Sequence, residues 1–137
     1  KRLSKSEYLA RYQVADLFLD TRLYNAGTTA SDALRMGLPV LTCIGNSFAS
    51  RMGASVISAL NLPELITTTE EEYESLAIEL ATHPEKLKII KDKLASNLST
   101  APLYDTKLFT KNLESAYTMM YERHHQGLDP DHIYVKH

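Results

Sequence analysis

Apolar residues in the first half of the chain gather in short runs, and helical patterns separate these runs. Runs of this length without polar alternation are typical of strands buried on both faces of a sheet. They lie at Asp16–Asp20, Pro39–Gly45 and Glu64–Thr68. Between them the spacing predicts helices over Thr29–Met36 and over Phe48–Leu60, the second capped by Ser47. Strands that alternate with helices through short connections predict a parallel α/β sheet with right-handed crossovers.

The second half of the chain has a helical pattern throughout. Apolar residues recur every three or four positions on both sides of His83-Pro84, where the proline interrupts the pattern. The last predicted helix, Thr106–His125, carries one apolar stripe and ends before Gly127 and an extended tail. The stripe consists of Phe109, Leu113, Ala116, Tyr117 and Met120. We therefore predict a βαβαβ segment over residues 1–69 and a helical segment with an extended tail over residues 70–137, together forming one structural unit.

Composition and charge exclude several classes of protein. The 137 residues are 44% hydrophobic and 23% charged, which is ordinary for a globular chain. A net charge of −2 gives no basic footprint for nucleic acid or an acidic membrane, and no apolar stretch approaches the ~18 residues of a membrane span. The single cysteine, Cys43, lies in an apolar run and predicts a buried, inert thiol in a cytoplasmic protein. Because the chain starts at Lys1 and enters directly at a helical pattern, we expect a fragment of a larger protein.

The strongest candidate site is the stretch from Tyr24 to Val40. A glycine, Gly27, is followed by Thr28 and Thr29 at a predicted helix start, with Asp32 one turn further on. The N-terminus of a helix presents free N–H groups and a partial positive charge, which suit a phosphate, and Asp32 suits a ribose hydroxyl. The same residues also fit a simple helix cap. The familiar phosphate loops G-x-G-x-x-G and G-x-x-x-x-G-K-[ST] are missing from this stretch.

A second candidate lies on the predicted first helix, Ser4–Ala15, where Ser4 and Glu7 have the spacing of a capping box. Lys5, Tyr8 and Arg11 fall three residues apart on one face, where they could grip a nucleotide base, although the pattern also fits a solvated face. The histidines near the C-terminus do not have the spacing of a metal site, so we expect no metal and no cofactor. They are His124, His125 and His132.

Seven separated blocks resemble one family in order and spacing. They are ADLFLDT, NAGTTASDALRMGLPVLT, SFASRMGAS, LPELI, EYESLAIELATHPEKL, APLYDTKLFTKNLESAY and PDHI. In this respect the chain is similar to the C-terminal end of the catalytic region of O-linked N-acetylglucosamine transferases, including the SPINDLY-type proteins. The resemblance implies the C-terminal half of the nucleotide-binding lobe of a two-lobed GT-B glycosyltransferase, with a partial Rossmann-like sheet and long C-terminal helices. The family usually carries tetratricopeptide repeats before this region.

The resemblance also assigns roles to the candidate residues. It implies that Thr28 and Thr29 bind the diphosphate of UDP and that Asp32 binds its ribose. Lys5 and Arg11 match basic residues of the uridine pocket. Two positions depart from the family pattern, because Tyr8 and Gly27 stand where many members carry histidine. The main catalytic lysine and histidine of the family lie upstream of Lys1, so no catalytic residue is expected in this chain.

The function implied by the resemblance is inverting transfer of N-acetylglucosamine from UDP to Ser or Thr of acceptor proteins. Retaining enzymes of this fold often place a glutamate in the loop after the first strand, whereas Asp32 is the only acid between Asp20 and Gly37. The alternatives are a GDP-fucose-type or other GT-B enzyme, and a non-catalytic nucleotide-sugar-binding or scaffolding module. We expect this piece alone to be inactive and to self-associate through an exposed C-terminal helix.

Overall fold

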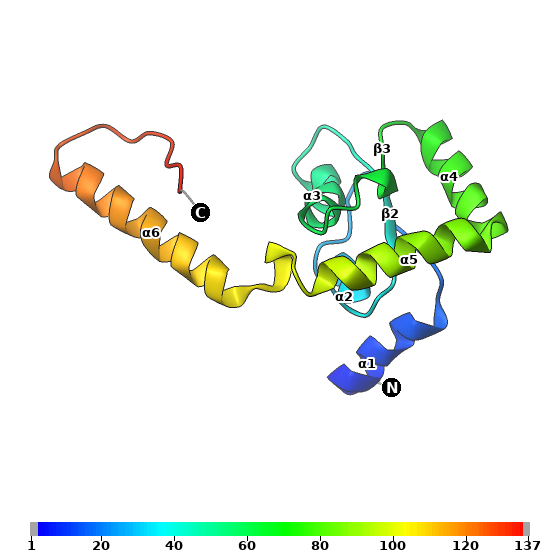
Figure 1. Cartoon of the computed structure of the whole chain (residues 1–137). Helices are drawn as coiled ribbons and strands as arrows, with labels where there is room; N and C mark the ends of the chain where they lie inside the picture. The colour runs from blue at the N-terminus through cyan, green and yellow to red at the C-terminus, as the bar shows by residue number, and fades with distance from the viewer. Residues whose placement is uncertain (1–2, 136–137) are drawn as a thin grey trace. The chain divides into compact units, whose positions relative to one another are not determined.

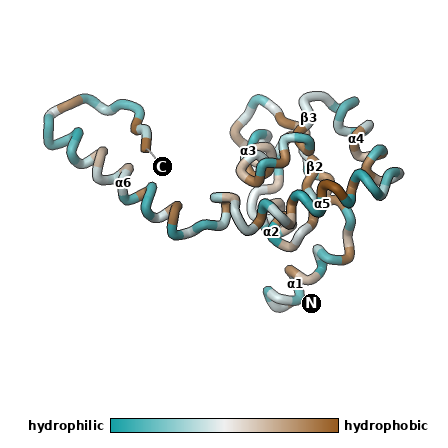
Figure 2. Tube along the Cα trace, viewed as in Figure 1, coloured by the Kyte–Doolittle hydropathy of each residue, from teal (hydrophilic) through white to brown (hydrophobic). Residues whose placement is uncertain are grey.

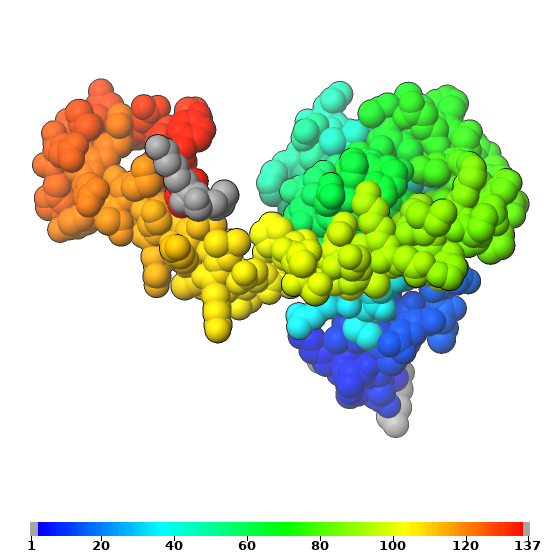
Figure 3. Space-filling view, in the orientation of Figure 1, coloured from blue at the N-terminus to red at the C-terminus, as the bar shows by residue number. Residues whose placement is uncertain are grey.

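The computed structural model describes residues 3–135, which fold as two compact units that divide between Ala101 and Pro102 (Figure 1). Within the described range, no helix is both long and apolar enough to cross a membrane. The first unit contains a small sheet and the helices that pack against it. In the space-filling view, the green to yellow-green chain of its second half forms one continuous face of that unit (Figure 3).

The sheet of the first unit has three parallel strands in the order β1-β2-β3. The strands are β1 (Phe18–Leu19), β2 (Val40–Cys43) and β3 (Ile66–Thr67). Phe18 pairs with Val40, and Thr42 pairs with Ile66. The predicted parallel α/β sheet is therefore confirmed. The paired segments are shorter than the apolar runs, and β3 is preceded by a 3₁₀ turn, η3 (Pro63–Leu65), whose proline has no N–H to give to a ladder.

Four helices pack around this sheet and bury its apolar side chains. They are α2 (Thr28–Arg35), α3 (Met52–Ala59), α4 (Glu70–Thr82) and α5 (Pro84–Leu98). Figure 2 shows brown, hydrophobic segments in the region of β2 and β3 and along α5. The largest fully buried side chains include Leu34 of α2, Leu41 of β2, Ile57 of α3 and Leu94 of α5. Each helix thus contributes its apolar face to one shared core.

Local signals explain where several of these helices begin and end. Thr69 caps α4 through a capping box with Glu72, and Pro84 is the first residue of α5. After α2 the backbone of Gly37 has φ +81°, a left-handed conformation that glycine adopts without strain. Asn61 adopts φ +55° after α3. These ends agree with the predicted helix boundaries.

Two predicted helices are less regular than expected. The first consists of α1 (Lys5–Ala10), with the predicted Ser4–Glu7 capping box, followed by the 3₁₀ turn η1 (Arg11–Val14). The predicted helix Phe48–Leu60 is likewise wrong at its start. It opens as a separate 3₁₀ turn, η2 (Ala49–Arg51), before α3. Ser47 accepts a hydrogen bond from the Ser50 N–H at 3.2 Å, so it closes this tight turn and does not cap α3 directly.

The second unit consists of a 3₁₀ turn, η4 (Pro102–Tyr104), the helix α6 (Thr106–His125) and the C-terminal tail. The side chain of Asp105 caps α6 by accepting a hydrogen bond from the Leu108 N–H at 2.9 Å. Gly127 follows the helix with φ +68°. The bounds of α6 agree with the prediction. None of its residues is buried, and its apolar stripe, including Phe109 at 65% exposure, is largely open.

The two units divide between Ala101 and Pro102, whereas the sequence analysis placed the boundary between its two segments after residue 69, within one structural unit. The difference arises because α4 and α5 contribute side chains to the core of the first unit. Leu80 of α4 and Leu94 of α5 belong to the buried core, and α4 contacts β2 directly. Helical periodicity alone cannot show this, because an amphipathic helix looks the same whichever unit it covers.

Candidate functional site

The connection from β1 to α2 is held by two buried polar side chains. Asp20, at the end of β1, is 4% exposed and accepts hydrogen bonds from the N–H of Thr21 at 2.8 Å and of Ala26 at 2.7 Å. Asn25 is 2% exposed, donates to the Thr21 carbonyl at 2.7 Å and accepts from the Gly53 N–H at 3.3 Å. The connection therefore has a fixed path up to the start of α2.

The N-terminus of α2 offers hydrogen-bond donors that no residue in the described part of the chain uses. Gly27 is the N-cap residue, and no side chain caps the helix. The side chains of Thr28 and Thr29 are exposed and form no hydrogen bond to any residue between 3 and 135. The first backbone hydrogen bond into the helix runs from the Ser31 N–H to the Gly27 carbonyl at 3.0 Å. The N–H groups of Thr28 and Thr29 precede that bond and point out of the helix end.

This geometry corrects one of the two interpretations of the threonine pair. The helix-cap interpretation requires Thr28 or Thr29 to be the N-cap residue, with its hydroxyl accepting a backbone N–H. Both residues instead lie inside the helix, after Gly27. The cap interpretation is therefore wrong. Two hydroxyls and two N–H groups lie at the positive end of the helix dipole, an arrangement suited to an anion.

Asp32 lies one turn further along α2, on the same side of the helix as Thr28 and Thr29. It is half-buried, and its negative charge reaches Tyr12 of η1. Burial is the largest cause of a pKa of Tyr12 raised above its ordinary value, followed by the hydrogen bond with the Tyr8 hydroxyl and then by the charge of Asp32. The structure thus brings the predicted ribose residue close to the segment that carries the predicted base pocket.

The residues of the first helix take three different positions. Tyr8 is half-buried, and its hydroxyl lies 2.6 Å from the hydroxyl of Tyr12. Arg11 is exposed and lines the same hollow as both tyrosines, a volume of about 430 Å³ floored by apolar residues such as Leu38. Lys5 is exposed on the first turn of α1 and is not among the residues that line this hollow. The structure therefore brings Tyr8 and Arg11 together at this hollow, but not Lys5.

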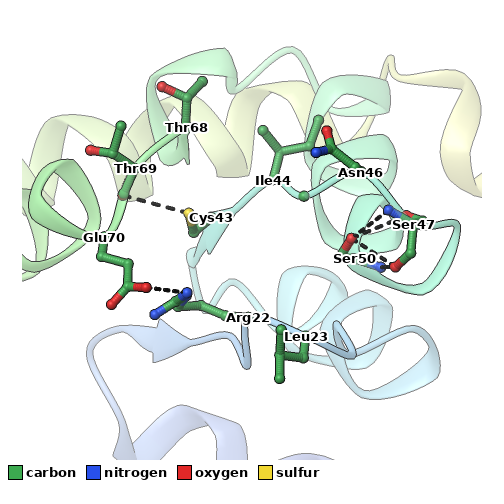
Figure 4. Close-up of a pocket in the computed structure, with 11 residues that line it drawn as sticks. Arg22, Leu23, Cys43, Ile44, Asn46, Ser47, Ser50, Thr68, Thr69 and Glu70 are labelled. Atoms are coloured by element: carbon green, nitrogen blue, oxygen red, sulfur yellow. Dashed lines mark hydrogen bonds and ion pairs between the residues drawn. The ribbon is translucent and has the colours of Figure 1, made fainter.

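A separate cavity of about 480 Å³ opens where all three strands end (Figure 4). An ion pair between Arg22 and Glu70 crosses it, and the Cys43 thiol donates to the Thr69 carbonyl at 3.5 Å. The hydroxyl groups that line this cavity already form hydrogen bonds within the protein. The Ser47 and Ser50 hydroxyls bond each other, the Thr68 hydroxyl donates to the Glu72 carboxylate, and the Thr69 hydroxyl accepts the Glu72 N–H. The threonine pair of α2 does not line this cavity. We consider the α2 turn the better anion site, because its donors are free.

Sequence reasoning missed the residues that hold the site in place. Asp20 was recognised only as the end of a strand, and Asn25 and Tyr12 were not singled out. The signal that could have found Asp20 is a charged residue directly after an apolar run. A carboxylate buried at such a place requires several hydrogen-bond donors around it, and so it organises the loop that follows. Tyr8 and Tyr12 are four positions apart on a predicted helix, and this spacing is the signal that could have found their contact. Among residues 3–135, no three His, Cys, Asp or Glu side chains gather as metal ligands.

Comparison with known proteins places this α/β unit among glycosyltransferases. The model of glycosyl transferase family 41 matches residues 2–113, most of the chain. The chain belongs to glycosyl transferase family 41. It is 38% identical over 132 residues to a probable UDP-N-acetylglucosamine–peptide N-acetylglucosaminyltransferase, SEC, of Arabidopsis thaliana, covering 96% of the chain and 14% of that protein. It is 36% identical over 130 residues to the UDP-N-acetylglucosamine–peptide N-acetylglucosaminyltransferase of Caenorhabditis elegans, covering 95% and 11%.

A solved structure agrees with this assignment. The K341M mutant of Thermobaculum terrenum O-GlcNAc transferase superposes with a TM-score of 0.80 at 34% identity, covering 87% of this chain and 23% of that one. The predicted resemblance and the predicted fold class, part of a glycosyltransferase α/β lobe, are confirmed. The chain spans between 11% and 14% of the length of these two relatives.

Proposed function

We propose that this chain grips the diphosphate and uridine of a UDP-sugar in an inverting enzyme that transfers N-acetylglucosamine to Ser or Thr of proteins. The observation that carries the proposal is the pair of free threonine hydroxyls at the start of α2, together with the unused N–H groups beside them. Donors that are already fixed in place need no reorganisation when an anion arrives. Family membership supplies the sugar-transfer chemistry to which such a site belongs.

The site would contribute to the reaction by stabilising the leaving group. As the bond between sugar and diphosphate breaks, negative charge develops on the diphosphate oxygens. The N–H groups of α2 and the hydroxyls of Thr28 and Thr29 donate to those oxygens, and the helix dipole favours the same charge. Asp32 accepts from the ribose hydroxyls, while Tyr8, Arg11 and Lys5 contact the base. We propose that these protein donors meet the charge without a metal ion.

Calorimetric titration of the full-length protein with UDP, GDP and ADP tests this proposal. We expect selective UDP binding, weakened about tenfold or more in a Thr28→Ala/Thr29→Ala variant that loses two hydrogen bonds to a charged group. The matched control is Ser55→Ala/Ser58→Ala, which removes two exposed hydroxyls from α3. Selectivity for GDP would move the proposal to a fucose donor. Unchanged affinity in the threonine variant would contradict the assignment of the diphosphate site.

The remaining parts of the proposal concern partners and place. Acceptor proteins would be bound outside this chain, and the enzyme would act in the cytoplasm.

The exposed apolar stripe of α6, including Phe109 and Tyr117, would drive self-association of this piece alone. Sedimentation of the 137-residue chain beside a Phe109→Glu/Tyr117→Glu variant tests this point. A monomer in both samples would contradict it.

A further inference from the structure

Asp20 is a buried carboxylate with no cationic partner. It is 4% exposed and forms no ion pair with any residue in the described part of the chain. Three donors satisfy it instead. Its Oδ1 accepts the N–H groups of Thr21 and Ala26, and its Oδ2 accepts the Thr42 hydroxyl at 2.7 Å. A buried charge is costly unless it is fully hydrogen-bonded, so this arrangement calls for an explanation.

The hydrogen bond to Ala26 connects Asp20 directly to the candidate site. Ala26 immediately precedes Gly27, the N-cap of α2, and Thr28 and Thr29 follow. The bond, at 2.7 Å, therefore fixes where the chain enters the helix. The next residue back, Asn25, is held from the other side, because its N–H donates to the Ala49 carbonyl at 3.0 Å. The entry to α2 is thus clamped on both sides.

The surrounding elements exclude water from this carboxylate. A Cβ atom on Gly53 of α3 would lie 2.4 Å from Asp20 Oδ2 and 2.8 Å from Thr42 Oγ1, so α3 packs directly on the Asp20–Thr42 pair. Tyr73 of α4 donates its hydroxyl to the Asp20 carbonyl at 2.9 Å. Four elements, β1, β2, α3 and α4, therefore meet at Asp20. A carboxylate held so firmly can set the position of the loop that it binds.

We propose that Asp20 is a positioning residue for diphosphate binding, which acts by fixing the entry to α2 and so aiming the donors of Thr28 and Thr29. This inference rests on the proposed function and adds to it a residue that does not touch the ligand. Its carboxylate oxygens accept hydrogen bonds from Thr21, Ala26 and Thr42, so Asp20 affects anion binding through the position of the loop. A neutral side chain with the same acceptor oxygen fulfils the same role.

Two substitutions of Asp20 separate position from charge. Asp20→Ala removes every acceptor, whereas Asp20→Asn keeps an oxygen for the two backbone N–H groups and offers its amide to the Thr42 oxygen. In the full-length protein we expect Asp20→Ala to weaken UDP binding about tenfold or more, while uridine binding changes less than about twofold. Asp20→Asn retains most of the UDP affinity. This split between UDP and uridine would not follow from a general loss of stability, which lowers both affinities in proportion.

Hydrogen exchange of residues 21–29 supplies a readout that needs no ligand. Asp20→Ala should raise exchange in this segment specifically, and Asp20→Asn should restore its protection. UDP affinity that stays within about twofold in Asp20→Ala, or an equal loss of UDP and uridine binding, overturns the inference. If wild-type protein does not bind UDP, the proposed function fails. Independently of UDP binding, unchanged hydrogen exchange of residues 21–29 in Asp20→Ala would overturn the inference that Asp20 fixes the entry to α2. If Asp20→Ala does not fold, Thr42→Val removes one donor to the same carboxylate and is measured in its place.

Discussion

The hydroxyl oxygens of Tyr8 and Tyr12 lie 2.6 Å apart, and their rings meet edge to face with centroids 5.6 Å apart. The two residues are four positions apart, at the junction of α1 and η1, so the contact stays within one turn of chain. It orients the Tyr8 ring, which the proposed function places against the base. Tyr12 therefore fixes Tyr8 much as Asp20 fixes the turn before Thr28.

The first prediction concerns stability in alkali. Burial, the Tyr8 hydroxyl and the charge of Asp32 raise the pKa of Tyr12 above its ordinary value, although the charge of Arg11 opposes them. A phenol whose pKa is raised in the folded state contributes stability below its ordinary pKa of about 10, and this contribution is lost as the pH rises towards the folded value. The free energy of unfolding, measured in urea, should therefore decrease as the pH rises above about 10, and Tyr12→Phe should reduce the slope of this decrease.

Tyr134→Phe is the control for this measurement, because Tyr134 is 78% exposed. It should leave the alkaline slope as in wild type. An equal slope in wild type and Tyr12→Phe would show that Tyr12 is not held neutral by its surroundings.

A second prediction separates capping from binding at the α2 turn. Because Thr28 and Thr29 do not cap α2, Thr28→Ala/Thr29→Ala should change the free energy of unfolding by no more than about 0.5 kcal/mol. Thr69→Ala removes a hydroxyl that does accept the Glu72 N–H, at 3.1 Å, and should cost about 1 kcal/mol. Urea titrations of the three proteins test the difference. A loss in the double variant as large as that in Thr69→Ala would restore the capping interpretation.

The sequence predicted those parts of the fold that depend on local patterns. Apolar runs and helical periodicity predicted the strands of the parallel sheet and the bounds of α6, because the pattern of each element lies within a few neighbouring residues. The capping-box positions Ser4 and Glu7 were found for the same reason. At the site, the grouping of Thr28, Thr29 and Asp32 followed from their spacing on one helix.

The sequence could not predict features that depend on contacts between distant segments. The N-cap of α2 is Gly27 and not a threonine, and the loop before it is held by Asp20 and by Asn25, which bonds Gly53 of α3, 28 residues further along the chain. The predicted helix after Ser47 opens as a 3₁₀ turn where the Gly45 N–H donates to the Ser50 carbonyl at 2.9 Å. A local pattern contains no information on either contact.

A third prediction concerns acid stability at the start of α4. Hydrogen bonds from the Thr68 N–H, the Thr68 hydroxyl and the Thr69 N–H lower the pKa of Glu72 below its ordinary value. A carboxyl with a lowered folded pKa contributes stability above its ordinary pKa, and this is lost as the pH falls through the folded value. Stability should therefore decrease below about pH 4.5, and Glu72→Gln should show less of this decrease. Glu71→Gln, an exposed neighbour in the same turn, is the control.

The last prediction tests the close approach of α3 to the carboxylate at the end of β1. Gly→Ala in an exposed helix normally stabilises by about 1 kcal/mol. At Gly53 the added Cβ would meet Asp20 Oδ2 at 2.4 Å and Thr42 Oγ1 at 2.8 Å, so buried polar atoms must move. We expect Gly53→Ala to destabilise by about 1–3 kcal/mol, whereas Ser58→Ala on the exposed side of α3 changes stability by less than about 0.5 kcal/mol.

A double-mutant cycle identifies the cause of this loss. If contact with the Asp20 carboxylate is responsible, Gly53→Ala should cost less in an Asp20→Ala background, because the oxygen that the new methyl group meets is gone. Equal costs in the two backgrounds would assign the strain to Thr42 or to the backbone. Stabilisation by Gly53→Ala in wild type, of the size expected from helix propensity, would show that α3 does not pack against Asp20 as closely as the structure has it.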